Sequence, residues 1–263
     1  MSNTGDTRGV LYPAQLPKFY RVAPEAALAD RVSWFWIVHW HLAPGRVSRQ
    51  ELLPFPQMNL VIQQEGISLS GPATGASHRD LHGSGWALAA LLRPAAIPAL
   101  CSAPHQLRDR EVPFHAPGLH QRIVQLATRA PQSLAHLGVQ LFSECLEELL
   151  PTPRAQDLQA NALLELIGNT RQLVRVEDLA NQMNLSVRSL QRFALRYTGL
   201  TPLSLIRRYR LQEVAQRLRE DPMLSLAQLA AELQYTDQAH LSADFRRVLG
   251  HSPGRYRQAA QGT

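Results

Sequence analysis

Several residue types are scarce in this chain of 263 residues, and each scarcity narrows the class of protein. The two cysteines, Cys101 and Cys145, are too few for a disulfide framework and match no metal-binding spacing. No apolar run reaches the roughly 20 residues that a membrane-spanning helix needs. The opening residues 1–20 are polar and lack the apolar core of a secretory signal. We therefore expect a cytoplasmic protein with no membrane partner.

Lysine is almost absent, since Lys18 is the single lysine among 27 basic residues. Residues 156–263 contain 14 arginines and 10 acidic residues, so the excess of positive charge extends into the last part of the chain. Arginine recognises phosphate and guanine through a planar fork of donors. This preference fits a nucleic-acid partner, although a GC-rich genome would produce the same bias. The sequence pI of about 9.9 is compatible with either explanation.

Two kinds of sequence pattern meet at Pro151-Thr152-Pro153, where prolines disfavour both helix and sheet pairing. Before about residue 115, short strand-like runs alternate with turn signals, which predicts an antiparallel barrel or sandwich. After Pro117 the leucine spacing becomes helical. We predict an α+β protein with a β-rich domain at 1–153 and an all-α domain at 154–263. The expected strands are 32–42, 57–66, 67–71 and 85–94, and the expected helix pair of the first domain is 119–130 and 133–150.

The most informative pattern occurs twice in the last third of the chain, at 176–199 and 225–250. Each copy has a short helix with Leu-Ala, a tight turn, and a longer helix with a polar or basic side. Helix-turn-helix DNA-binding motifs have this order of elements, and their second helix enters the major groove. A helix expected at 202–221 would join the copies, and about 17 helical residues span about 25 Å. Its predicted core positions are Leu203, Ile206, Leu211, Val214 and Leu218.

In the first copy, Ser186 is the expected N-cap of the second helix. Arg188, Gln191 and Arg192 share one side of that helix, where arginine can bind guanine and glutamine can bind adenine. Arg196 extends the same basic surface, and the alternative for this surface is an ordinary solvated helix face. The predicted core positions on the opposite side are Leu190, Phe193, Ala194 and Tyr197.

In the second copy, Asp237 is the expected N-cap. The expected outward residues of the following helix are Gln238, Ala239, Ser242 and Arg246. Asp244 would repel phosphate, so we expect it to face away from DNA and to pair with Arg247 or Arg208. The second copy is therefore predicted to contribute less to DNA recognition than the first.

Residues 157–258 resemble the DNA-binding domain of AraC/XylS-type transcription regulators. The resemblance rests on the motifs LSVRSLQRF, GLTP, RRYRLQEVAQRL, LAQLAAELQYTDQAHLSADFRR and GHSP. It implies a sequence-specific transcription factor with double-stranded DNA and, by family analogy, RNA polymerase as partners and a nucleoid-associated location, and it leaves the choice between activator and repressor open. Family members often have glycine where this chain has Asn184 and Gln234. The base-contacting positions that the resemblance implies are Arg188, Gln191, Arg192, Gln238, Ala239 and Ser242.

The N-terminal region is similar to a less characterised β-rich, cupin-like domain found ahead of such modules. The resemblance implies a sensor or dimerisation domain, and hence a small-molecule effector or a homodimer. Trp34, Trp36, Trp40 and Trp86 are candidates for lining an apolar ligand pocket, with ordinary core packing as the alternative.

A second hypothesis is a metal-dependent cupin-type enzyme fused to a DNA-binding tail. His39 and His41 share one face of a strand, and Glu51, His78 and His82 are the remaining candidate ligands. The sequence contains no convincing nucleophile–base pair or phosphate-binding loop. We therefore expect no enzymatic activity, no catalytic residues, no metal and no cofactor.

Overall fold

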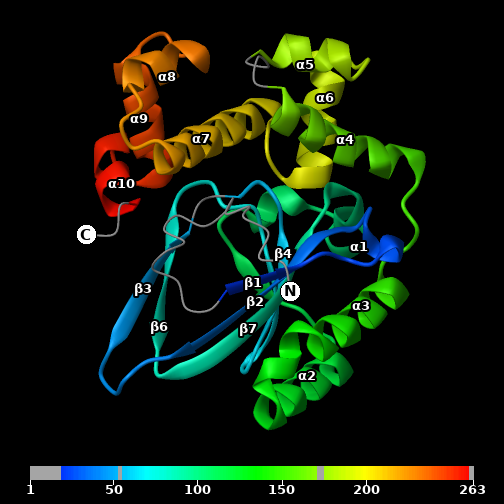
Figure 1. Cartoon of the computed structure of the whole chain (residues 1–263). Coiled ribbons are helices and arrows are strands. Elements are labelled where there is room, and N and C mark those ends of the chain that lie inside the picture. Colours follow the sequence, from blue (N-terminus) through cyan, green and yellow to red (C-terminus); the bar gives the residue numbers. More distant parts are fainter. Residues whose placement is uncertain (1–18, 53–54, 171–174, 261–263) are drawn as a thin grey trace.

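A computed structural model describes residues 19–52, 55–170 and 175–260. A β-rich domain is followed by residues 151–154, which have neither helix nor strand, and then by helices only. The helical part lies across one end of the β-rich domain (Figure 1). This arrangement confirms the predicted α+β fold with a β-rich N-terminal and an all-helical C-terminal region.

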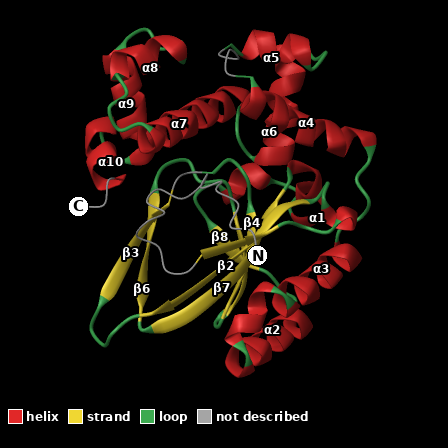
Figure 2. Ribbon diagram, in the orientation of Figure 1, coloured by secondary structure: helices red, strands yellow, loops and turns green. Residues whose placement is uncertain are grey.

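The strands form two antiparallel sheets in the described ranges. The larger sheet has six strands in the order β1-β2-β7-β4-β5-β8, and β3 pairs with β6 in a separate two-stranded sheet (Figure 2). The strands are β1 (Phe19–Val22), β2 (Val32–His41), β3 (Val47–Leu52), β4 (Asn59–Gln63), β5 (Gly66–Ser70), β6 (Ser77–His82), β7 (Ser84–Leu92) and β8 (Glu111–Pro113).

The predicted strands correspond to β2, β4, β5 and β7, whereas β1, β3, β6 and β8 were not predicted. β3 and β6, with sequences VSRQEL and SHRDLH, are mostly polar and lack a strong alternation of apolar residues. They are stable as strands because they pair with each other over six residues, from Val47 opposite His82 to Leu52 opposite Ser77.

The main core of the β-rich domain lies between one face of the larger sheet and two helices, α2 (Pro117–Arg129) and α3 (Leu137–Leu149). Phe35 and Ile37 of β2 are fully buried there, and the Phe35 ring packs against Phe142 of α3 at 5.6 Å between centroids. The helix predicted from residue 133 begins later, because Pro131–Ala135 forms a 3-10 turn, η5. None of the helices in the described ranges combines the length and apolar character needed to cross a bilayer.

Seven helices make up the C-terminal region, counted over its described residues. α7 spans the distance between a helix pair at each of its ends (Figure 1). The helices are α4 (Ala155–Asn169), α5 (Val176–Gln182), α6 (Val187–Thr198), α7 (Pro202–Glu220), α8 (Leu226–Glu232), α9 (Gln238–Leu249) and α10 (Pro253–Ala260).

Helix α7 contributes to two separate hydrophobic cores. Its first part packs with α4, α5 and α6, and its second part packs with α8, α9 and α10. The predicted burial of Ile206, Leu211, Val214 and Leu218 is confirmed. The predicted burial of Leu203 is wrong, since its side chain is 50% exposed and Leu205 is buried instead. Leu205 belongs to the buried stripe of the helix, whereas Leu203, two residues earlier in the sequence, points away from that stripe.

Helix α4 attaches the helical region to the β-rich domain. The Asn161 side chain accepts a hydrogen bond from the Ala95 amide at 3.0 Å and donates one to the Asp30 carbonyl at 2.8 Å. Four residues further along α4, Glu165 forms an ion pair with Arg93. Because the amide of Asn161 is buried and satisfied on both sides, it fixes the position of α4 on the β-rich domain.

Candidate nucleic-acid interface

Each helix pair has the backbone geometry of a helix-turn-helix. α5 and α6 are connected through Asn184, which has a φ of 53°, and α8 and α9 through Gln234, with a φ of 55°. These are the two positions where related domains were expected to have glycine, and both adopt the left-handed conformation that glycine tolerates best. The two turns are therefore equivalent although their sequences differ.

The second helix of each pair begins with a side-chain cap, as predicted. The Ser186 hydroxyl accepts a hydrogen bond from the Ser189 amide at 3.1 Å, and the Asp237 carboxylate accepts one from the His240 amide at 2.7 Å. Each cap satisfies an amide that the helix itself leaves without a partner. Both helices end at a glycine in the left-handed conformation, Gly199 and Gly250. α6 and α9 are therefore delimited by matching start and stop signals.

The side chains of α6 separate into a buried and an exposed side. Arg188, Gln191 and Arg192 are exposed together with Arg196 and the cap Ser186. The four predicted core residues of α6, Leu190, Phe193, Ala194 and Tyr197, are all buried. The five candidate residues of the first unit are thus all accessible to solvent.

Tyr197 anchors α6 to α4. Its hydroxyl donates a hydrogen bond of 2.7 Å to Asp157, whose other oxygen accepts from the Arg154 amide at 2.8 Å. Burial, together with this hydrogen bond to a carboxylate, raises the pKa of Tyr197 to about 12. Burial alone would raise the pKa of Asp157, but the donors from Arg154 and Tyr197 outweigh it and lower the pKa. The pair stabilises the first unit in its ionised-carboxylate, neutral-phenol form.

In the second unit, Gln238, Ala239 and Arg246 of α9 are exposed and Ser242 is half-buried. This surface carries less positive charge than that of α6.

Asp244 faces the interior, and its side chain is 3% exposed. It pairs with Arg247, as expected, but its other partner is Arg207 of α7, at 3.1 Å, instead of Arg208. Arg208 instead donates to the Ala73 carbonyl of the β-rich domain at 3.1 Å. Asp244 therefore connects α9 to α7 inside the second unit.

The β-rich domain contacts both units at the C-terminal ends of their second helices. At the end of α6, a Cβ on Gly199 would lie 2.7 Å from the Pro104 carbonyl oxygen. At the end of α9, the Val248 carbonyl accepts a hydrogen bond from the Ala76 amide at 2.6 Å. Arg188 and Gln238 lie in the first turns of α6 and α9. The contacts with the β-rich domain and these candidate DNA-contacting residues therefore occupy opposite ends of the same helices.

The four tryptophans do not line one pocket. Trp34, Trp36 and Trp40 alternate with the buried Phe35 and Ile37, so they lie on the face of β2 turned away from α2 and α3. Trp86 instead packs against the main core on the opposite face. Trp40 covers Gly85, where a Cβ would meet its ring at 2.2 Å. Trp86 lies on the face of the main core because it pairs with His39, and a ligand pocket lined by some of the four tryptophans stays a prediction.

The candidate metal ligands divide between β2, which carries His39 and His41, and the paired strands β3 and β6, where Glu51 lies opposite His78. His39 lies on the side of β2 that carries Phe35 and Ile37, and partial burial lowers its pKa. His78 and His82 are exposed on β6 of the two-stranded sheet, where the intervening residue Leu81 is buried. Over the ranges that the structure describes, no three His, Cys, Asp or Glu side chains are grouped to hold a metal ion.

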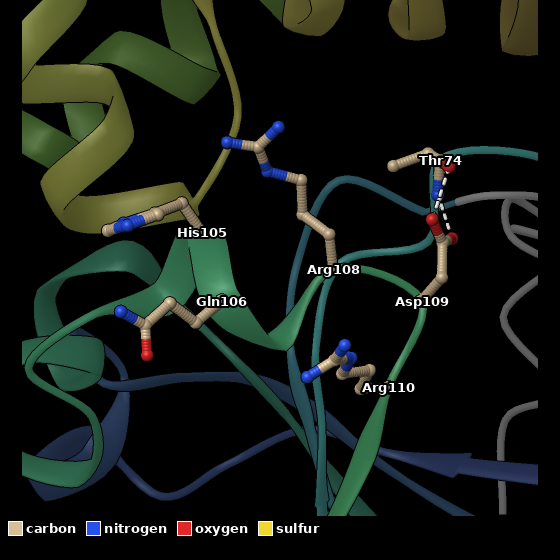
Figure 3. A pocket seen from close by; sticks show the side chains of 6 residues that line it. All are labelled: Thr74, His105, Gln106, Arg108, Asp109 and Arg110. Carbon is tan, nitrogen blue, oxygen red and sulfur yellow. Dashed lines mark hydrogen bonds between the residues drawn. The ribbon is translucent and has the colours of Figure 1, made fainter.

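A cluster of polar residues that the sequence analysis did not select lies beside the contacts between the two domains. It includes His105, Arg108 and Arg110, which line a hollow together with Thr74, Gln106 and Asp109 (Figure 3). One indication of this cluster was present in the sequence, because its three basic residues lie within six positions of the chain. The partner loop is more than 30 residues earlier in the sequence, so the hollow itself could not be predicted.

Two families match separate parts of the chain. Residues 179–259 match a helix-turn-helix domain, and residues 20–113 match a domain of unknown function, DUF6597. The chain is 31% identical over 176 residues to the HTH-type transcriptional activator RhaS of Escherichia fergusonii, covering 59% of this chain and 62% of that protein. It is 30% identical over 138 residues to RhaS of Pectobacterium carotovorum, covering 50% and 49%. The chain thus spans between about half and two thirds of these two relatives.

Solved structures give matches at low identity. ToxT of Vibrio cholerae is 12% identical with a TM-score of 0.46, covering 87% of this chain and 99% of that one. The C-terminal domain of AraT, a response regulator of Geobacillus stearothermophilus, is 24% identical with a TM-score of 0.34, covering 37% and 81%.

The repeated helix pairs, their caps and their turns define the C-terminal region as a double helix-turn-helix domain. The sequence match at 179–259 is to a helix-turn-helix domain and agrees with this assignment.

Proposed function

We propose that this protein is a sequence-specific transcription regulator that binds double-stranded DNA through α6 and α9 in two adjacent segments of the major groove. The observation that carries the proposal is the matched exposure of polar side chains along two capped second helices, at opposite ends of the connecting helix α7. An α-helix fits the major groove, where its outward side chains reach the base edges.

The exposed residues divide into stronger and weaker candidates for base recognition. Arg188 and Arg192 have the guanidinium fork that binds guanine O6 and N7, and Gln191 can bind adenine. Ser186 and Arg196 flank them and are proposed to contact the DNA backbone. In the second unit, Gln238, Ala239, Ser242 and Arg246 take the corresponding roles, with fewer positive charges available. We therefore propose that α6 supplies most of the affinity.

The proposal also covers the mode of regulation, the role of the β-rich domain and the location of the protein in the cell. The two relatives described above are transcriptional activators, which supports activation and contact with RNA polymerase for this chain. The β-rich domain is proposed to act as a sensor or dimerisation module, and the protein to be cytoplasmic and nucleoid-associated. We propose no catalytic role, because the candidate metal ligands divide between β2 and the β3–β6 pair, and no three of them group within the described residues.

The test begins by selecting bound fragments from genomic DNA and footprinting the protein on the selected site. Two protected major-groove segments, about one helical turn or 34 Å apart on one face, are expected. The affinity of Arg192→Ala for that site should fall by about 1–3 kcal/mol. Arg129→Ala serves as the control, because Arg129 is an exposed arginine on α2 in the other domain.

Three outcomes would contradict the proposal. One is a selection that enriches no sequence, and another is protection of a single groove segment. The third is an Arg192→Ala variant with unchanged affinity for the selected site, which would mean that Arg192 of α6 does not contact the DNA bases.

A further inference from the structure

The hollow lined by Thr74, His105, Gln106, Arg108, Asp109 and Arg110 is here called the basic pocket, and it has a volume of about 550 Å³. Two loops form it. One, residues 71–76, follows β5, and the other, residues 104–110, begins with the 3-10 turn η4 (Pro104–Leu107). Both loops belong to the β-rich domain and lie on its side facing the helical domain.

The two loops are firmly connected. Asp109 accepts hydrogen bonds from the Thr74 amide, at 2.5 Å, and from the Thr74 hydroxyl. The Gly71 amide donates to the Arg110 carbonyl at 2.9 Å. The approach is so close that a Cβ at Gly71 would lie 1.8 Å from the Leu107 carbonyl oxygen. The pocket is therefore held in shape by the protein before any ligand arrives, which lowers the entropic cost of binding.

The pocket has a surplus of positive charge. Neither the Arg108 nor the Arg110 guanidinium has an acidic partner within the part of the chain that the structure describes. The single acid of the lining, Asp109, is turned toward Thr74 and away from both arginines (Figure 3). His105 adds a further nitrogen donor. Behind the pocket, burial lowers the pKa of Arg208 of α7 to about 10, and the charges of Asp109 and Arg108 act on it in opposite directions.

We propose that the basic pocket binds a small, water-soluble multivalent oxyanion, carrying carboxylate or phosphate groups. Arginine forks bind carboxylate and phosphate with two parallel hydrogen bonds, and a lining with two arginines that point in different directions and a histidine suits a ligand with more than one anionic group. A volume of about 550 Å³ accommodates an organic ligand larger than a single phosphate ion. The open, polar lining selects against an apolar ligand.

The position of the pocket couples its occupancy to the DNA-reading units. The 71–76 loop contacts α9, through Ala76 and Val248, and α7, through Ala73 and Arg208. The 104–110 loop meets the end of α6 where Pro104 faces Gly199. An anion bound in the pocket therefore lies beside the segments that contact three helices of the DNA-binding region. This regulatory step rests on the proposed function, whereas binding of the anion does not.

The experiment measures thermal unfolding and calorimetric binding of the full chain with citrate and with inorganic phosphate, using sodium chloride at matched ionic strength as reference. Citrate is expected to raise the unfolding temperature and to bind with one site per chain, more tightly than phosphate. The double variant Arg108→Gln/Arg110→Gln should bind citrate at least tenfold more weakly, since hydrogen bonds to charged groups are lost. The matched control is Arg122→Gln/Arg129→Gln, which removes two exposed arginines from α2 and should leave citrate binding unchanged.

Two further variants separate this proposal from DNA binding. Arg188→Ala/Arg192→Ala should bind citrate normally, whereas loss of citrate binding in that variant would assign the anion to the DNA surface and overturn the proposal. Equal weakening by the pocket and the α2 variants, or no specific citrate effect at all, would also overturn it. Arg108→Gln/Arg110→Gln should keep its DNA affinity without citrate. If DNA binding is absent in every variant while citrate still binds, only the proposed function fails.

Discussion

Two glycines in equivalent positions allow the effect of the contact between α6 and the β-rich domain on the free energy of unfolding to be measured. Gly199 ends α6 with a φ of 72°, and Gly250 ends α9 with a φ of 73°. An alanine at either position would have to adopt a left-handed conformation, which costs about 1–2 kcal/mol. The surroundings differ, because no described residue beyond the chain neighbours lies within 4 Å of a Cβ at Gly250, whereas a Cβ at Gly199 would lie 2.7 Å from the Pro104 carbonyl oxygen.

We therefore expect Gly250→Ala to destabilise the protein by about 1–2 kcal/mol. Gly199→Ala should cost about 1–3 kcal/mol more, because the new methyl group overlaps backbone of the β-rich domain and must displace it. The assay is urea unfolding of both variants, followed by hydrogen exchange of the amides around Pro104. Faster exchange there is expected in Gly199→Ala alone.

The comparison is decisive because the backbone strain is the same in both variants. Equal losses of stability, with unchanged exchange around Pro104, would refute the conclusion that the end of α6 is pressed against the β-rich domain. A larger loss in Gly250→Ala than in Gly199→Ala would refute it as well.

Two further predictions concern the first unit and the DNA surface. Tyr197→Phe should destabilise the protein by about 1–3 kcal/mol at neutral pH, measured by urea unfolding. Because the folded pKa of Asp157 is lowered, its stabilising contribution is present above its ordinary value of 3.8 and disappears as the pH falls through the folded value. The variant and the wild type should therefore converge in acid, and a pH-independent difference would contradict this account. The affinity for the selected DNA site should fall steeply with salt, and a flat dependence would exclude phosphate docking.

Local signals made the helical region predictable. A cap such as Ser186 or Asp237 and a stop such as Gly199 act within a few residues, so their effect can be read directly from the sequence. The same holds for the buried and exposed sides of α6, which follow from the helical period alone. The placement of Leu203 was wrong because a single apolar residue near a helix start does not define the direction of the buried stripe.

Contacts between distant residues could not be predicted. The partner of Asp244 was expected to be Arg247 or Arg208, and the structure adds Arg207, because the rotation of α7 against α9 decides which arginine reaches the carboxylate. Trp86 was grouped with the other tryptophans although the strand register places it on the opposite face. The same limit applies to the basic pocket, which depends on two loops from different parts of the sheet.

Asp244 provides a test of how the second unit is built, because two arrangements predict opposite results. If this carboxylate faced DNA, Asp244→Asn would leave stability unchanged and strengthen DNA binding by removing repulsion from phosphate. The structure instead buries Asp244 between Arg207 and Arg247.

Removing the charge of Asp244 should therefore lower the free energy of unfolding by about 1–3 kcal/mol, less than for a fully buried pair because both arginines reach water. The control Glu220→Gln removes the same charge from an exposed position at the end of α7 and should have little effect on stability. Urea unfolding and DNA titration of both variants distinguish the two arrangements. Unchanged stability together with tighter DNA binding in Asp244→Asn would mean that α9 is rotated relative to the orientation described here. Its outward residues, including Gln238 and Arg246, would then have to be reassigned.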